Sequence, residues 1–289
     1  MILCEITYAK LRQQHVEQND VKTDSKTGEE KNMREQSELQ VTVRGAIIGG
    51  SKPLICLPLV GDTRAKVLQE AEALVSLQPD LLEWRIDAYD KVENIEDCLS
   101  LLNEIRGVIG ETPLIFTCRI DLEGGIKEIS RENRLKISSS AMETGDIDII
   151  DIELCNDKEF VGIIKRQAKQ CGVCLILSYH NFKETPSEAF IYSKLVEAQE
   201  AGAEISKVAV MPKNHSDVLT LLSATNKARN EAVRGPMVTM SMGPEGAVSR
   251  LAGGLFGSDI TFAIGMQASA PGQIPIKELK NGLALLYNG

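Results

Sequence analysis

A lysine in an otherwise apolar segment is the residue of this sequence that most clearly suggests chemistry. Lys207 lies in "EISKVAVMP", residues 204–212, whose β-branched and apolar residues predict a short buried strand. A lysine is almost never fully buried unless it is paired. Burial and nearby cations such as Arg85 and Arg119 would favour the neutral amine, and a neutral amine attacks carbonyl groups. The position of Lys207 therefore indicates a Schiff-base lysine.

His180 is the second residue whose type and position suggest catalysis. It ends the apolar run "VCLILSYH", residues 173–180, whereas His15 lies in a polar segment and His215 follows Pro212. Its imidazole titrates near neutral pH, so it can act as a general acid and base if a carboxylate orients it. The alternative is a histidine that only satisfies hydrogen bonds in the core.

Charged side chains also gather at the ends of other apolar runs. Glu83 and Arg85 end one run, and Arg119 ends the next, with Glu123 four residues later. Further polar residues end or lie in later runs: Asp151, Glu153 and Ser241. Residues two apart on a strand share a face, so Glu83 and Arg85 should point the same way, as should Asp151 and Glu153. A pair such as Glu83 and Arg119 could also serve the structure alone, by neutralising each other.

The elements that would position these residues repeat one pattern along the chain. Short apolar runs, separated by segments with helical spacing, begin 24 to 34 residues apart. The runs cover residues 54–59, 80–85, 113–119, 147–153, 173–180, 205–212, 236–242 and 260–265. Eight strands that alternate with eight helices predict an α/β fold, a (β/α)8 TIM barrel. In such barrels the catalytic groups lie at the C-terminal ends of the strands.

The N-terminal part of the chain has a different composition. Residues 10–40 are polar and nearly free of large apolar side chains, so residues 1–40 are predicted to be a disordered arm and residues 41–289 the barrel domain. The barrel domain opens with "VTVRGAIIGGSKP", in which two β-type runs flank Gly49 and Gly50. We expect a β-hairpin here that closes the barrel bottom.

Composition excludes several classes of function. A net charge of −9 argues against nucleic acid as a partner, and no apolar run approaches the ~18 residues of a membrane helix. The N-terminus lacks the pattern of a secretory signal, so a cytoplasmic location is expected. Seven cysteines, an odd number, are expected to be reduced thiols.

Two segments near the C-terminus suggest a binding site for an anion. Arg250 lies in the glycine-rich segment "MGPEGAVSRLAG", and its guanidinium could bind a carboxylate through two hydrogen bonds. The segment "GMQASAPGQIP" that follows the last strand is typical of a mobile cover. "CGVC" and "DIDIIDIE" lack the further ligands that a zinc or calcium site needs, so no metal site is predicted.

Six motifs together resemble one enzyme family. They are "LLEWRID", "FTCRIDLEGG", "SYHNF", "SKVAVMP", "MSMGPEGAVSRLAGGLFGS" and "QASAPGQI". In this order, from about Val41 to the C-terminus, they resemble type I 3-dehydroquinate dehydratase, a lyase of the shikimate pathway. The resemblance implies a small-molecule substrate, 3-dehydroquinate, no metal or organic cofactor, and a homodimer.

The resemblance also implies a role for each candidate residue. Lys207 would form a Schiff base with the substrate ketone, and His180, held by Glu123, would move the protons of a syn elimination of water that gives 3-dehydroshikimate. Substrate hydroxyls would be bound by Glu83, Arg85 and Arg119. The substrate carboxylate and the closing lid would be held by Arg250, Ser269 and Gln273.

One residue departs from the family pattern, and alternative functions stay open. Pro58 stands where several family members have a serine near the substrate, so no role is assigned to it. A class I aldolase also uses a lysine on the sixth strand, and a barrel that only binds ligands is a third possibility. No strand followed by G-x-G-x-x-G is present, so a fused shikimate dehydrogenase is not expected.

Overall fold

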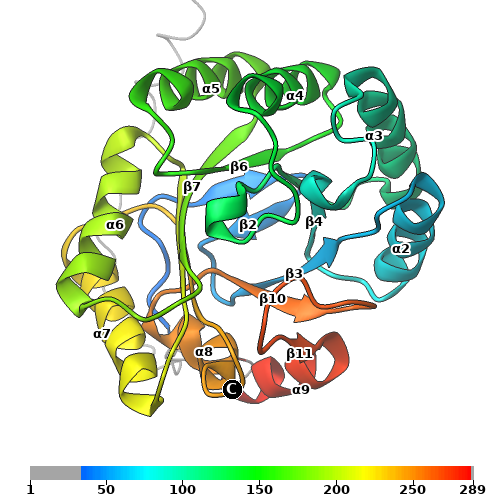
Figure 1. The fold of residues 1–289 in the computed structure, drawn as a ribbon. Helices are drawn as coiled ribbons and strands as arrows, with labels where there is room; N and C mark the ends of the chain where they lie inside the picture. The colour runs from blue at the N-terminus through cyan, green and yellow to red at the C-terminus, as the bar shows by residue number, and fades with distance from the viewer. Residues whose placement is uncertain (1–33, 288–289) are drawn as a thin grey trace, which may run out of the picture. The chain divides into compact units, whose positions relative to one another are not determined.

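The structure is a computed structural model that describes residues 34–287. Parallel strands are hydrogen-bonded in the order β11-β10-β3-β4-β5-β6-β7-β8-β9, and a bridge from Met237 to Ser258 joins the β9 side to the β10 side. The sheet therefore curls into the predicted (β/α)8 barrel (Figure 1). The barrel strands are β3 (Leu54–Leu59), β4 (Leu81–Arg85), β5 (Leu114–Thr117), β6 (Ile149–Glu153), β7 (Cys174–Asn181), β8 (Ile205–Val210), β9 (Met237–Ser241) and β10 (Ile260–Ile264). The short β11 (Ile274–Pro275), which the sequence did not predict, extends β10.

Helices surround the strands and follow the predicted alternation (Figure 1). They are α2 (Arg64–Ser76), α3 (Ile95–Ile109), α4 (Arg131–Thr144), α5 (Lys158–Cys171), α6 (Glu188–Ala201), α7 (His215–Glu231), α8 (Ala247–Ala252) and α9 (Ile276–Tyr287). Each helix from α2 to α7 begins after a Ser, Thr, Asn or Asp side chain that accepts a backbone hydrogen bond of its first turn.

Helix α8 is shorter than the helical pattern over residues 245–256 suggests. It passes into the 3-10 helix η3 (Gly253–Phe256), where two glycines lower helix propensity. Close packing is the second reason, because a Cβ on Gly254 would lie 2.6 Å from the Tyr287 hydroxyl.

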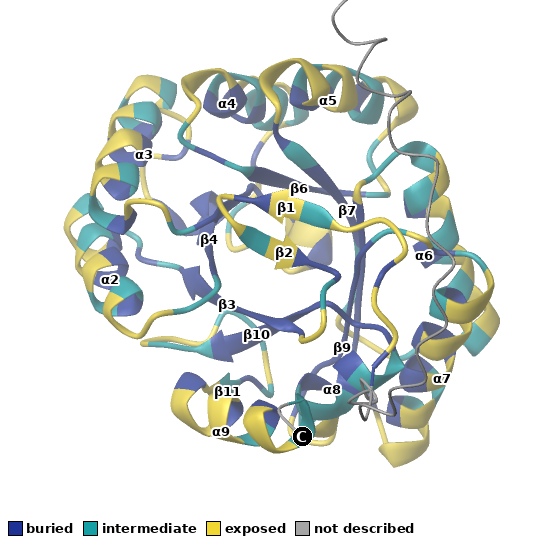
Figure 2. Cartoon of the chain, turned by 180° about the vertical axis from the view of Figure 1, so that it is seen from behind, coloured by how far each residue is buried: buried dark blue, intermediate teal, exposed yellow. Residues whose placement is uncertain are grey.

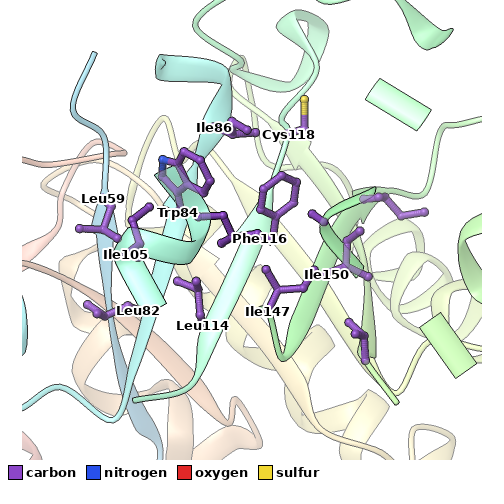
Figure 3. Close-up of a cluster of buried hydrophobic side chains, with 14 of the residues drawn as sticks. Leu59, Leu82, Trp84, Ile86, Ile105, Leu114, Phe116, Cys118, Ile147 and Ile150 are labelled. Carbon is purple, nitrogen blue, oxygen red and sulfur yellow. The ribbon is translucent and has the colours of Figure 1, made fainter. Parts of the chain in front are cut away.

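Side chains alternate between the two faces of each barrel strand. The outward residues pack against the helices, as Figure 3 shows for Trp84 and Phe116, whose rings meet edge to face with centroids 5.7 Å apart. The inward residues at the start of the strands are apolar: Leu81, Ile115, Ile149, Ile176, Ile205, Val238 and Ile260. Two residues further along β4, β6 and β8, the same inward face carries Glu83, Asp151 and Lys207.

An N-terminal hairpin covers the other end of the barrel, as predicted. Strands β1 (Val41–Val43) and β2 (Ala46–Ile48) pair antiparallel and lie across the barrel in Figure 2, and Val43 and Ile48 pack on the apolar inward layer. The predicted position of the turn was wrong. The chain turns at Arg44 and Gly45, which have φ angles of 44° and 83°, and not at Gly49 and Gly50.

Residues 34–40 pack on the barrel, although the sequence assigned them to a disordered arm. Buried Arg34 forms an ion pair with Asp259, and the hydroxyl of Ser37 donates to the same carboxylate at 3.1 Å. The backbone N–H of Leu39 donates to the carbonyl of Arg234 at 2.9 Å. The rest of the predicted arm, residues 1–33, lies outside the described residues.

Within residues 34–287, no helix combines the length and the apolar character required to cross a membrane.

Candidate active site

A pocket opens at the C-terminal ends of the barrel strands, opposite the hairpin. Its wall contains eight of the nine residues predicted from the sequence: Glu83, Arg85, Arg119, Glu123, His180, Lys207, Ser269 and Gln273. Apolar side chains complete the wall: Phe182, Ala209, Met240, Met242, Phe262 and Ala270. Titratable groups from four strands or strand ends thus converge on one apolar-sided cavity.

Lys207 reaches the pocket from the middle of β8. Its side chain is 5% exposed, and Nζ lies 2.7 Å from Oδ2 of Asp151 and 3.6 Å from Oε1 of Glu83. Nζ also lies 4.7 Å from the centre of the Phe262 ring, within the range of a cation–π contact. The amine is therefore held on one side of the cavity by a carboxylate and an aromatic face.

These neighbours differ from those expected. Arg85 and Arg119 were expected as cationic neighbours of Lys207 that favour its neutral form, but its direct charged partners are two carboxylates, which favour the ammonium form. Arg119 is itself bound to carboxylates, since its NH2 lies 2.9 Å from Asp151 and its NH1 lies 2.8 Å from Glu153. Asp151 therefore lies between the lysine and the arginine and faces both cations.

His180 and Glu123 form a hydrogen-bonded pair across the pocket wall. Nδ1 of His180 lies 2.9 Å from Oε2 of Glu123, and the backbone N–H of His180 donates to the same oxygen at 2.9 Å. Because Oε2 accepts the backbone N–H, it is an acceptor for Nδ1 as well, so we assign the imidazole proton to Nδ1. Nε2 then carries the lone pair, which is the form that a general base needs.

Burial and charge shift the pKa values of this pair in opposite directions. Burial, aided by the cations of Arg119 and Lys207, holds the pKa of His180 well below its usual value near 6.5. Burial raises the pKa of Glu123 to about 7. The imidazole of His180 is therefore neutral at neutral pH and available to accept a proton.

Arg85 and Glu83 project from the end of β4 on the same side, as the alternation predicted. The guanidinium of Arg85 donates two hydrogen bonds to Asp87, from Nε at 2.9 Å and from NH2 at 2.8 Å. Glu83 accepts from the hydroxyl of Thr117 at 2.9 Å and has Lys207 as its charged partner. The pair of Glu83 with Arg119, considered as a structural alternative, is therefore not a direct contact.

Ser269 and Gln273 face the pocket from the loop after β10. Nε2 of Gln273 donates to the Ser269 hydroxyl at 3.1 Å, and the backbone N–H of Ser269 donates to Oε1 of Gln273 at 2.9 Å. These bonds close the loop segment on itself above the apolar side of the cavity.

Arg250 lies behind this loop and is not part of the pocket wall. Its guanidinium donates to the carbonyls of Phe262 at 3.3 Å and Pro271 at 3.0 Å, and its buried Nε has no hydrogen-bond partner among the described residues. No carboxylate within residues 34–287 forms a salt bridge with it. Burial lowers the pKa of Arg250 to about 10. A buried arginine that contacts only neutral acceptors is suited to an anionic ligand.

Two carboxylates of the site were not among the predicted site residues. Asp151 was noted as a strand-end residue but received no role, and Asp87 was not noted at all. The alternation that places Lys207 inward also places Asp151 inward, so this signal was present in the sequence. Ser241, in contrast, was noted as a polar strand-end residue but does not belong to the site. It faces away from the pocket, and its backbone N–H donates to the hydroxyl of Ser249.

No group of three or more His, Cys, Asp or Glu residues within residues 34–287 has a geometry that could hold a metal ion.

The fold and the pocket together define a (β/α)8-barrel enzyme. Residues 55–289 match the family model described as type I 3-dehydroquinase. The chain belongs to this family, and its activity is that of a 3-dehydroquinate dehydratase, a hydro-lyase of the shikimate pathway. This membership favours the dehydratase over the aldolase and the barrel that only binds ligands.

Individual relatives support the same assignment over most of the chain. The 3-dehydroquinate dehydratase of Geobacillus thermodenitrificans is 43% identical over 247 residues, which cover 85% of this chain and 95% of that protein. The crystal structure of the Geobacillus kaustophilus enzyme matches with a TM-score of 0.85 at 42% identity and covers 87% of this chain and 98% of that one. The type I enzyme of Clostridium difficile, solved with covalent modified comenic acid, matches with a TM-score of 0.84 at 40% identity, over 89% of this chain and 99% of that one.

Proposed function

We propose that this pocket dehydrates 3-dehydroquinate through a covalent intermediate on Lys207, with His180 as general acid and base. One observation carries the proposal: a buried lysine amine and a neutral histidine, oriented by Glu123, line the same small cavity. The Clostridium difficile relative solved with a covalently modified ligand adds support.

Imine formation is the first step. The amine of Lys207 gives up one ammonium proton and adds to the ketone carbon, and this proton leaves with the carbonyl oxygen in one water molecule. The ammonium group and the ketone thus become an iminium ion and water. The iminium carries a positive charge, which the carboxylate of Asp151 at 2.7 Å from Nζ can compensate. The fixed position of Asp151 therefore favours the charged intermediate as well as the ammonium group.

Proton transfer and loss of water follow. The iminium withdraws electrons from the neighbouring carbon, so its C–H bond becomes acidic enough for Nε2 of His180 to take the proton. The electron pair left behind expels the hydroxyl group, and His180 returns the proton to the departing oxygen, which leaves as water. Hydrolysis of the remaining iminium consumes one water molecule and releases 3-dehydroshikimate. Water is formed twice and consumed once, so the net change is the loss of one water molecule.

Substrate binding is assigned to two sets of polar and charged side chains. Glu83, Arg85 and Arg119 offer one acceptor and two donors for ring hydroxyls. Arg250, Ser269 and Gln273 would hold the substrate carboxylate, and the loop that carries Ser269 and Gln273 would close over it. The buried, uncompensated charge of Arg250 is the physical reason for assigning it to the carboxylate.

Reduction by borohydride during turnover tests the covalent step. With 3-dehydroquinate present, we expect loss of activity and a reduced adduct on the peptide that contains Lys207, located by mass spectrometry. Lys207→Arg is the matched control, because it keeps a cation beside Asp151 but cannot form an imine. An adduct on another residue, or none under turnover conditions, would contradict the mechanism.

We also propose that the protein is a homodimer, as the family resemblance implies, and that it is located in the cytoplasm, as expected from the sequence. Size-exclusion chromatography with light scattering tests the first point, and a mass of one chain, 31.6 kDa, would contradict it.

A further inference from the structure

Asp87 is a buried carboxylate that joins two parts of the active site. It lies in the 3-10 helix η1 (Ile86–Ala88), directly after β4, and is 0% exposed. Each of its two oxygens accepts one hydrogen bond from Arg85 and one from a backbone N–H. It does not line the pocket, so it does not touch the substrate in the proposed mechanism.

The two backbone groups bound by Asp87 lie at the two ends of one turn. Oδ1 accepts from the N–H of Arg119 at 3.3 Å, and Oδ2 accepts from the N–H of Ile126 at 3.0 Å. Between these residues the chain forms the 3-10 helix η2 (Asp121–Glu123), which carries Glu123. A single buried carboxylate thus fixes the beginning and the end of the segment that holds the partner of His180.

Arg85 adds a third bond to the same turn. Its NH2 donates to the carbonyl of Gly124 at 3.1 Å as well as to Asp87. The two bonds to Asp87 orient a guanidinium that faces the pocket, and the separate bond to Gly124 links this guanidinium to the residue next to Glu123. Charge-assisted bonds of this kind are the strongest in a protein interior.

The ring of Phe182, directly after β7, contacts the turn from the other side. At Gly124, which has a φ angle of 87°, an added Cβ would lie 2.3 Å from the Phe182 ring. The turn therefore has the Phe182 ring on its β7 side and the hydrogen bonds to Asp87 on the other. Glu123 keeps its place because its turn is held on both sides.

We propose that Asp87 is a positioning residue for catalysis, which sets Glu123 against His180 and Arg85 against the substrate. This inference rests on the proposed roles of Glu123, His180 and Arg85. Loss of the Asp87 charge would free both ends of the turn, and a displacement of about 1 Å in such a pair can cost about 100-fold in rate.

The test compares Asp87→Asn with Asp148→Asn. Asp148 is a matched control at the opposite end of the barrel, because its carboxylate likewise binds arginines and one backbone N–H, that of Leu114. We expect Asp87→Asn to lower kcat roughly 10- to 100-fold and to raise KM, while Asp148→Asn changes neither by more than about twofold. The rates are expressed per active site, counted from the borohydride adduct on Lys207, so that a fraction of unfolded protein does not enter the comparison.

The adduct count also separates this inference from the proposed function. If the unsubstituted protein forms no adduct on Lys207, the proposed function fails. If Asp87→Asn forms the adduct and has the same kcat per site as Asp148→Asn, the positioning role of Asp87 is wrong. If Asp87→Asn does not fold, Asp87→Glu replaces it, since it keeps the charge and displaces it by one methylene group. A similar loss of kcat per site is expected there, and normal turnover would overturn the proposal.

Discussion

One oxygen of Glu123 accepts both the backbone N–H and the ring Nδ1–H of His180, each at 2.9 Å. The backbone bond fixes where the carboxylate lies, and the ring bond fixes which nitrogen of the imidazole is free. The orientation of the proposed general base is therefore coupled to the backbone of the strand that carries it.

Glu123→Gln should make the protein more stable at high pH and less active. The pKa of Glu123 is raised to about 7 in the folded protein, so its contribution to stability is present below its unfolded value near 4.5 and is lost as the pH rises through 7. Glutamine carries no charge to bury, so the variant should gain up to about 3 kcal/mol relative to the unsubstituted protein between pH 4.5 and 8. Thermal unfolding at these two pH values measures the difference. A difference that does not grow with pH would contradict the raised pKa.

His180→Ala should leave imine formation possible and slow the proton transfers. General acid–base groups typically contribute about 10²- to 10⁴-fold, so a loss of kcat in this range is expected, together with an adduct on Lys207 that still forms under borohydride. Near-normal turnover would exclude His180 as the base.

The same variant reports on the charge of His180 in the folded protein. Because the folded pKa lies well below 6.5, the unsubstituted protein should lose stability as the pH falls below 6.5, where the unfolded chain takes up a proton and the folded chain does not. His180→Ala lacks this group, so its melting temperature should fall less between pH 7 and pH 5. Parallel losses in both proteins would show that the folded pKa is not depressed.

Asp151→Asn should weaken both the fold and the covalent step. The carboxylate is 1% exposed, lies 2.7 Å from Lys207 and 2.9 Å from Arg119, and accepts the Ser178 hydroxyl at 2.6 Å. Removing one partner of a buried ion pair costs about 3–5 kcal/mol, because the other charge is left behind. We expect a lower melting temperature and, in single-turnover trapping with borohydride, slower formation of the adduct. Adduct formation at the normal rate would show that Asp151 stabilises the fold alone.

Much of the site follows from the two-residue period of the strands. Ile205 and Lys207 are two residues apart on β8 and share its inward face, as Leu81 and Glu83 do on β4. The sequence therefore shows that the inward face of both strands begins with an apolar residue, which is followed by a charged one. Eight such runs define the barrel, and the barrel brings their ends together. The pocket residues on the strands were thus predictable without knowledge of side-chain contacts, whereas Ser269 and Gln273 were implied only by the family resemblance.

The remaining features depend on contacts between distant segments. At the hairpin turn, Gly45 was a local signal that the prediction of the turn passed over, whereas the bond from Arg44 to Asp148, 104 residues away, could not be read from the local sequence. Arg34 lies in a polar segment typical of disorder, yet it is buried against Asp259, 225 residues away. The partners of Lys207 likewise come from β4 and β6, so their identity depended on strand order and not on the motif around the lysine.

Arg250→Met should separate stability from substrate binding. The guanidinium is buried, and within residues 34–287 only neutral acceptors bind it, so the folded protein without ligand bears the cost of a desolvated charge. Methionine is apolar and flexible enough to occupy the same space, so the melting temperature without ligand should stay equal or rise. A ligand carboxylate, by contrast, would lose its charged partner, and KM for 3-dehydroquinate should rise by at least tenfold, the factor that corresponds to about 1.4 kcal/mol. Added 3-dehydroshikimate should also stabilise the variant less, by a free energy that corresponds to the rise in Kd, because this stabilisation depends on the ratio of ligand concentration to Kd. Unchanged KM in Arg250→Met would remove the arginine from the binding site and leave its buried charge without a role.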